Sequence, residues 1–347
     1  MAAPYTPIVL STPVLNPSVG TSGAPPLAYL SNSQFLAEPT AISGADLAPA
    51  GNSGAQSAAL ALVLEEASSW ANEIAYGVDA ASDGASLAAS LSVESMFTKV
   101  RQGELRLLCD YKPIIELVGC DVGANPSSVA SIGTVSSLAR FGRRTIYVPW
   151  SPSLTFRQGD TPAQPYAVVG TYGRVYVVWS YVAGYAHTKL VADATVGATT
   201  CSVAATDGNG GLWGVYPASG AFPGSQLHIV DGVSSESVFV TSITPGSGAS
   251  IGTTVLGTTP FAYAHTVPNA PDFLPVTMLP ANVRRAVVQL AMALIKVRGS
   301  RAMVMPETVG GRPSRQALAQ AGGLEDYEIA VKILGNYAVR LKKSGLD

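Results

Sequence analysis

Charged side chains are scarce in this sequence, and basic ones are absent from its first 98 residues. Asp, Glu, Lys and Arg make up 13% of the 347 residues, about half of the usual share. Residues 1–98 contain eight carboxylates and no Lys or Arg, whereas residues 284–347 carry eleven Lys or Arg against five Asp or Glu. An acidic start and a basic end can neutralise each other within one subunit, or between copies that associate head to tail. The sequence leaves both arrangements open.

The sequence also lacks the features of an exported or membrane-spanning chain. Its three cysteines form no C-x-x-C pair, which favours buried, reduced thiols in a protein made in a cytoplasm. No basic segment precedes an apolar core at the N-terminus, so we expect no secretory signal. We expect no contact with a membrane, because six prolines exclude a spanning helix in the uncharged residues 1–37: Pro4, Pro7, Pro13, Pro17, Pro25 and Pro26.

Sequence motifs for catalysis and cofactor binding are missing. The chain has neither a phosphate-binding G-x-x-x-x-G-K-[ST] loop nor a G-x-G-x-x-G turn, and no H-E-x-x-H or Cys/His zinc spacing. Its three histidines lie in or beside apolar strands, and no G-x-S-x-G nucleophile turn accompanies them: His187, His228 and His265. We interpret all three as structural, and we expect no enzyme activity, no cofactor and no metal.

Glycine, proline and apolar residues are abundant instead. Hydrophobic residues make up 47% of the chain, which also contains 35 Gly and 24 Pro. Such a composition is typical of short strands joined by tight turns. Residues 1–52 alternate Pro, Ser and Gly with short apolar clusters, and we interpret them as an extended arm that docks on another surface.

Three segments have the apolar spacing of amphipathic helices. Residues 54–77 repeat apolar side chains every three or four positions, with Ser53 as the expected N-cap and Gly77 as the expected end. Residues 281–298 and 324–343 show the same period. The last of these begins with acidic and ends with basic residues, as the helix dipole prefers.

Between the first two helices the apolar period changes to two residues. Two strands around a turn at Gln102-Gly103 predict a β-hairpin near the start of this region, and a third short strand follows at 113–123. Residues 189–266 hold alternating strands divided by Gly-rich turns, with a hairpin turn at Asp231-Gly232. The remaining predicted strands cover 144–150, 166–173 and 174–185.

These elements predict an α+β fold in three parts. Residues 1–52 form the extended N-terminal arm. Residues 53–188 and 275–347 form a small α-helical bundle with a β-hairpin region, and residues 189–270 form an inserted small β domain. In this prediction the helices are the core, and the β segments are excursions from it.

The order of the elements resembles the head–tail connector (adaptor) proteins of long-tailed bacteriophages. The helix ending ASSWANEIAYG and the following QGELRLLCDYKPIIELVG are similar to that family's helix with an AS-x-W/I pattern and to the hairpin behind it. YVAGYAHTKL resembles its Y-x-A-G strand, and LPANVRRAVVQLAMALIKVR resembles the helix that comes next. The resemblance covers about 60–125, 174–190 and 278–345. The insertion at 189–266 and the long arm depart from the family pattern.

This resemblance implies a structural virion protein at the head–tail junction, assembled in the cytoplasm of a bacterial host. It implies a homo-oligomeric ring, typically twelve-fold, below the portal protein, and DNA passes through this ring without specific binding. A further neck or tail protein is the other expected partner, and the uncharged arm is expected to lie on a neighbour. Six residues are candidates for contacts with sister subunits or the portal, and the arginines among them also for contacts with DNA: Arg298, Arg301, Arg312, Arg315, Tyr327 and Tyr337.

Other functions stay open from the sequence. One is a different phage structural protein, from the tail or decorating the capsid. Another is a carbohydrate-binding β domain, with Trp150, Trp179 and Trp213 as candidate platforms, although core or interface positions explain these residues more simply. The basic C-terminal third also raises nucleic-acid binding. A formal net charge of −2 favours instead basic side chains on solvated helix faces or against an acidic neighbour.

Overall fold

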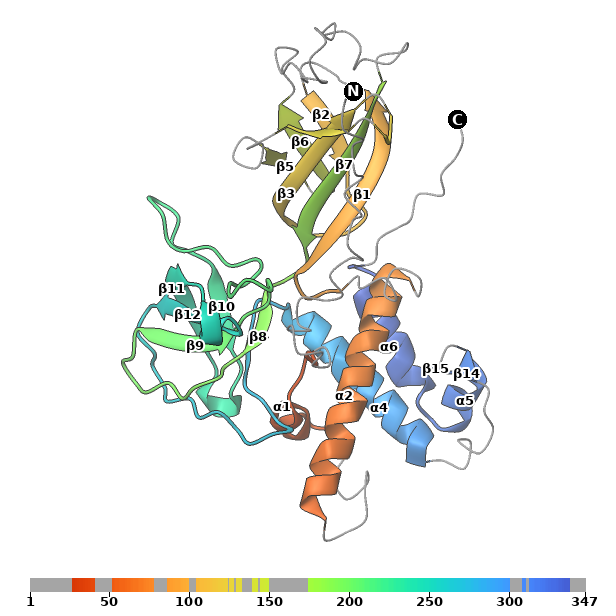
Figure 1. The fold of residues 1–347 in the computed structure, drawn as a ribbon. Coiled ribbons are helices and arrows are strands. Elements are labelled where there is room, and N and C mark those ends of the chain that lie inside the picture. Colours follow the sequence, from red (N-terminus) through yellow and green to blue (C-terminus); the bar gives the residue numbers. More distant parts are fainter. Residues whose placement is uncertain are drawn as a thin grey trace, which may run out of the picture.

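The structure is a computed structural model that describes most of the chain (Figure 1). The predicted strand at 166–173, most of the predicted arm and the end of the last predicted helix lie outside the described residues. The described residues are 27–40, 52–77, 86–99, 104–123, 125–127, 129–132, 139–142, 144–149, 174–299, 308–309 and 312–337.

Within this part of the chain there are five α-helices. The two long ones lie at the predicted places, and Asn52 rather than Ser53 caps the first by accepting a hydrogen bond from the Ala55 N–H. That helix ends at Gly77, whose positive φ of 93° suits glycine. Two short helices escaped prediction because each is only six residues long. The helices are α1 (Asn32–Ala37), α2 (Ser53–Tyr76), α4 (Ala281–Gly299), α5 (Arg315–Gln320) and α6 (Leu324–Leu334).

Helices α2, α4, α5 and α6 pack together as a helical layer, although about 200 residues separate α2 from α4 (Figure 1). Leu64, Ala67 and Ala71 of α2 share one buried cluster with Val287 and Leu290 of α4. Burial of this apolar stripe is what stabilises the layer, at about 25 cal/mol for each Å² removed from water.

Two antiparallel sheets face each other as a β-sandwich at the top of Figure 1. Their shared core contains Leu105 and Leu107 of one sheet and Val177, Trp179 and Tyr181 of the other. The larger sheet has the order β1 (Ser90–Lys99), β7 (Arg174–Ala183), β3 (Ile114–Gly123) and β4 (Ala130–Ser131). The smaller one has the order β2 (Glu104–Leu108), β6 (Thr145–Pro149) and β5 (Arg140–Phe141).

A third antiparallel sheet, of six strands, curls into a half-barrel around its own apolar cluster. Its two edge strands meet at a bridge between Leu190 and Val203. Along the chain, the first strand of this sheet covers 187–189 and its last strand covers 275–277. The predicted insertion, 189–270, lies within this range. Its order is β8 (His187–Lys189), β13 (Pro275–Thr277), β10 (Gln226–Ile229), β11 (Glu236–Thr244), β12 (Thr253–Thr258) and β9 (Thr200–Ala204). A two-stranded ribbon, β14 (Thr308–Val309) and β15 (Arg312–Pro313), precedes α5.

The predicted fold class, a small helical bundle with β excursions, is wrong. The described chain is mostly β, with three antiparallel sheets of six, four and three strands beside the helical layer. Two of the three apolar cores belong to the sheets alone. The β segments are therefore folded modules with cores of their own, and not excursions from a helical core.

The predicted β-hairpin around Gln102-Gly103 is also wrong in its pairing. Strand β1 pairs with β7 over its full length, from Ser90 opposite Ala183 to Lys99 opposite Arg174. Strand β2 pairs with β6 in the other sheet of the sandwich. The hairpin predicted at Asp231-Gly232 is confirmed, because β10 and β11 pair on either side of this turn.

A short segment around α1 joins the half-barrel to the helical layer (Figure 1). Tyr29 is buried against α2, and its hydroxyl lies 2.7 Å from Asn72 Oδ1 and 2.8 Å from Ser86 Oγ. On the half-barrel side, Gln34 Nε2 donates to the Val230 carbonyl oxygen at 2.9 Å and the Asn32 N–H donates to Asp272 Oδ1 at 2.8 Å. These contacts hold the half-barrel against the helical layer.

Candidate functional site

The basic side chains of the helical layer that were predicted to face partners have acidic neighbours within the subunit. Arg298 of α4 pairs with Glu66 of α2, and so joins the basic end of the chain to its acidic start. Arg315 of α5 pairs with Glu328 of α6 at 2.5 Å. Both pairs are partly exposed, and such pairs contribute about 0–1 kcal/mol each. Their main effect is to neutralise charge on the surface of the layer.

The two predicted interface tyrosines lie against aromatic rings of the same chain. Tyr327 stacks on Trp70 of α2, with ring centroids 5.1 Å apart. Tyr337 meets the edge of Tyr185 at 6.4 Å. Both tyrosines are half-buried, so each leaves part of its ring on the surface.

The structure does not describe the side chains of the other two predicted arginines, Arg301 and Arg312. Arg301 lies outside the described residues. Arg312 is in β15, where its backbone pairs with Val309. Whether any of the six candidates contacts a partner stays a prediction.

The start of α2 offers a surface of a different kind. Its first twelve residues, 53–64, contain no charged side chain. Leu60, Val63 and Leu64 are buried, but Ala58 is exposed and Leu62 keeps 61% of its surface in water. Apolar side chains therefore lie on more than one side of this part of the helix, and the outward ones are not covered by the described residues. Sequence reasoning identified this helix but did not identify its outward face.

The carboxylates of the half-barrel are engaged in holding its loops. All five of them accept hydrogen bonds, four from backbone N–H groups and two from His265. They are Asp193, Asp207, Asp231, Glu236 and Asp272. The carboxylates of residues 190–283 therefore stabilise turns and loops of their own subunit. Their oxygens are occupied by these hydrogen bonds and are less available to a partner.

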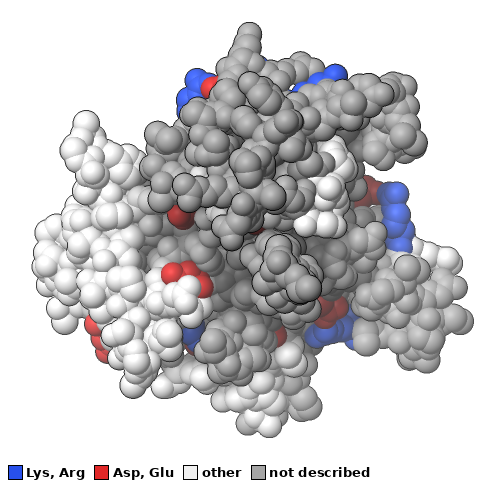
Figure 2. Space-filling view, turned by 45° about the horizontal axis from the view of Figure 1, so that its top comes forward, with Lys and Arg blue, Asp and Glu red and all other residues white. Residues whose placement is uncertain are grey.

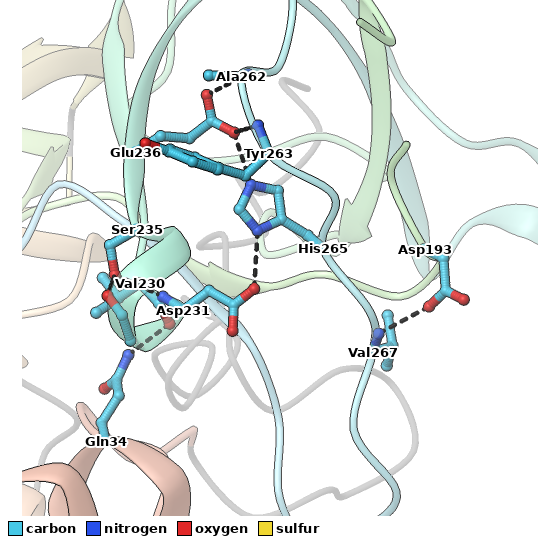
Figure 3. A network of polar contacts seen from close by, with 11 residues as sticks. Gln34, Asp193, Val230, Asp231, Ser235, Glu236, Ala262, Tyr263, His265 and Val267 are labelled. Carbon is cyan, nitrogen blue, oxygen red and sulfur yellow. Dashed lines mark hydrogen bonds and ion pairs between the residues drawn. The ribbon is translucent and has the colours of Figure 1, made fainter. Parts of the chain in front are cut away.

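His265 is the centre of the largest of these networks (Figure 3). It is fully buried, with Nδ1 at 3.0 Å from Asp231 Oδ2 and Nε2 at 2.8 Å from Glu236 Oε1. Glu236 also accepts from the N–H groups of Ala262 and Tyr263. Burial by itself would raise the Glu236 pKa, but these hydrogen bonds and His265 lower it below its usual value. The network locks the loop after β10 to the loop after β12.

His187 and His228 also have structural surroundings. His187 is buried, donates from Nε2 to the Ala28 carbonyl oxygen at 2.8 Å, and has Nδ1 at 3.0 Å from Thr277 Oγ1. Burial lowers its pKa to about 4. His228 Nδ1 lies 2.6 Å from Ser237 Oγ on the neighbouring strand. The described part of the chain brings no serine or cysteine nucleophile into a triad with these rings.

Glu94 is a polar site that sequence reasoning missed. Its side chain lies on the core side of β1, where it accepts hydrogen bonds from the Tyr181 hydroxyl and, at 2.9 Å, from the Asp110 N–H. Burial is the main cause that raises its pKa to about 7, and the nearby Asp110 adds to it. The Tyr181 oxygen in turn accepts from the Tyr111 N–H at 3.1 Å. Glu94 and Tyr181 thereby fix the corner between β2 and β3.

The three cysteines are free and buried, as the sequence predicts. Burial raises the pKa of Cys109 and Cys120 to about 12 and that of Cys201 to about 11, so all three thiols stay protonated at neutral pH.

Candidate sites for sugars and metals are sparse in the part of the chain that the structure covers. Trp179 is 1% exposed in the sandwich core and cannot form a sugar platform, whereas Trp213 is half-buried and Trp150 lies outside the described residues. The described side chains include no group of three or more His, Cys, Asp or Glu that could hold a metal ion. None of the described helices is long and apolar enough to cross a membrane.

The molecular surface agrees with this distribution of charge. On the face in Figure 2, most of the described surface is uncharged, and Lys and Arg appear singly or in small groups. The described atoms of this face show no continuous basic stripe of the kind that follows a nucleic-acid backbone.

Comparison with known families, with characterised proteins and with solved structures finds no match for this chain.

Proposed function

We propose that the chain is a structural subunit of the head–tail connector type, whose copies associate into a ring below the portal of a long-tailed phage. The proposal begins from the resemblance in the sequence. The segments that carry it fold as α2, as β2 and β3, as the end of β7 with β8, and as α4. Of these segments, the one from β7 to β8 connects the sandwich to the half-barrel (Figure 1).

The observation that carries the proposal is the uncharged, outward side of α2. Exposed apolar surface on an end of a helix that projects from the layer is a contact surface for another protein. We propose that this surface meets a different surface of the neighbouring copy, because such heterologous contacts generate a ring when the rotation between copies closes. The central contact we propose is therefore between residues 53–64 of one copy and its neighbour.

The charge distribution supports the second half of the proposal, passage of DNA. A channel lined by unpaired lysines and arginines would bind phosphates and slow the movement of DNA. Here the described basic side chains at Arg298, Lys296 and Arg315 are each neutralised by a carboxylate of the same subunit. Each copy in a ring adds a formal charge of only −2.

Replacement of Leu62 by glutamate tests this contact. Since Leu62 is 61% exposed, Leu62→Glu leaves the stability of the isolated subunit within about 0.5 kcal/mol. We expect native mass spectrometry to show rings for the wild type and mainly monomers for Leu62→Glu. The matched control is Val196→Glu, in a loop of the half-barrel with 64% exposure, which should still form rings. A wild type that is monomeric at every concentration, or a Leu62→Glu variant that assembles normally, would overturn the proposal.

A further inference from the structure

The four-stranded sheet of the sandwich carries apolar side chains on both faces. One face forms the sandwich core. On the other face, Phe97 of β1 lies opposite Tyr176 of β7, and their rings meet at 5.0 Å. We define the outer sheet face by the outward side chains of these two strands from Leu91 to Phe97 and from Tyr176 to Val182: Leu91, Val93, Ser95, Phe97, Tyr176, Val178, Ser180 and Val182.

This face differs from an ordinary solvated sheet face. Antiparallel sheets with one wet face alternate apolar and polar residues, whereas strands that are covered on both sides read as continuous apolar runs. Strand β7 reads RVYVVWSYVA, which is the second pattern. The outer sheet face is nevertheless open in part, because Phe97 is 52% exposed.

Charged residues adjoin this face on β3 and at one end: Asp121 lies opposite Val178, Glu116 opposite Val182, and Lys99 opposite Arg174. Between Leu91 and Phe97, the residues of β1 that point outward are uncharged, and so are their partners on β7. Asp121 and Glu116 lie on the neighbouring β3, and burial raises the pKa of both carboxyls. An occupant that stays on β1 and β7 between Leu91 and Phe97 therefore meets apolar and hydroxyl side chains and needs no charge of its own.

The described chain begins at the foot of this same sheet. The Ala28 carbonyl oxygen is held by His187, four residues after the end of β7. The Tyr29 hydroxyl accepts from the Ala88 N–H at 3.2 Å, two residues before the start of β1. Residues that precede Ala28 thus leave from the base of the two strands that form the outer sheet face.

Residues 1–26 have the composition and the length to cover it. They contain no charged residue and include the apolar cluster Ile8, Val9 and Leu10. A ten-residue strand such as β1 is about 33 Å long, and 26 residues reach up to about 85 Å when extended. The prolines of this segment cannot donate backbone hydrogen bonds, so it would lie across the face through side-chain contacts and would not extend the ladder.

We propose that residues 1–26 of the same chain cover the outer sheet face. This inference does not depend on the proposed ring, since it concerns a single subunit. It differs from the expectation that the arm lies on a neighbour, because the chain leaves at the foot of its own sheet.

Cysteine accessibility in the full-length chain tests the proposal. Phe97→Cys places a thiol on the outer sheet face, and Ser95→Cys repeats the test at a second exposed position of the same face. Each is compared with the same variant carrying Ile8→Asp and Leu10→Asp, since charged residues cannot stay on an apolar surface. The native thiols are buried and give the background rate. Val233→Cys, at a 99% exposed position of the half-barrel, is the control for general reactivity.

We expect maleimide to label both face cysteines several-fold faster when residues 8 and 10 are aspartate, with Val233→Cys unchanged. The protection should be the same at all protein concentrations. Equal labelling rates with the native and the charged segment would overturn the proposal. Protection that grows with protein concentration would also overturn it, because the covering segment would then come from another copy.

Discussion

The carboxyl of Glu94 makes folding of the sandwich depend on pH. Its pKa is raised from 4.5 to about 7 in the folded chain, chiefly by burial. The folded state therefore holds this proton more tightly than the unfolded state between these values, and stability falls as the pH rises from about 4.5 through 7. The effect is at most about 3 kcal/mol. His187 acts in the opposite sense over part of this range, because its lowered pKa removes stability as the pH falls below 6.5.

Glu94→Gln should remove the first of these dependences. We expect the variant to gain stability over the wild type at pH 8 and to lose that advantage at pH 5, as measured by urea unfolding at both values. Comparison with the wild type at each pH cancels the contribution of His187. Glu104→Gln, in an exposed ion pair of the same module, is the control and should follow the wild type. A difference between Glu94→Gln and the wild type that is the same at pH 5 and pH 8 would refute the role of this carboxyl.

Some of these residue environments could be predicted from the sequence, and others could not. Three histidines in apolar strands indicated structural roles, and hydrogen bonds to each of them agree with that interpretation. Glu94 gave no such signal, because its partner Tyr181 lies 87 residues away and only the pairing of β1 with β7 brings them together. The ion pair of Arg298 with Glu66, 232 residues apart, was equally hidden.

At the scale of elements, Gly184 controls the junction between the sandwich and the other modules. It follows β7 with a φ of 114°, and a Cβ atom there would lie 2.6 Å from the Ala88 carbonyl oxygen. Both the backbone conformation and the close approach require glycine. We expect Gly184→Ala to lower the free energy of unfolding by about 2–4 kcal/mol.

Thermal and urea unfolding measure this effect, with Gly252→Ala as the matched control. Gly252 is in a turn of the half-barrel with nothing within 4 Å of an added Cβ, so its replacement should change stability by no more than about 0.5 kcal/mol. If both replacements change the free energy of unfolding by the same small amount, the backbone at Ala88 can shift to accommodate a Cβ atom at residue 184, and the prediction is wrong.

The long helices were predictable, and strand partners distant in the sequence were not. The 3.6-residue period of α2 and α4 is local, so their bounds agree with prediction to within one residue. Alternation also located β3, β6 and β7, but it says nothing about which strand lies alongside. The predicted β1–β2 hairpin failed for this reason, since β1 found its longest match in β7, about 80 residues away.

At the scale of the whole molecule, the fold class was wrong because the β segments have two separate cores. Sequence reasoning recognised three helical faces and assigned the core to them. The sandwich and the half-barrel each have a core made of side chains from several strands. The sequence shows that these strands are apolar, but it does not show which of them share a core. The helical layer is one module of three, and α1 with its flanking residues joins it to the half-barrel.

This three-module subunit is the basis of the central claim, that copies form a ring on the axis of a portal. Contacts through α2 use the helical layer, which leaves the sandwich and the half-barrel free to face other partners along the axis (Figure 1). Such a division fits a subunit that must hold both its sisters and the proteins above and below it.

Electron microscopy of the purified full-length protein, alone and mixed with its candidate portal protein, tests this claim most directly. We expect rings that share the axis of the portal, and we expect Leu62→Glu to abolish them. Particles that remain monomeric and do not bind the portal ring would contradict the account.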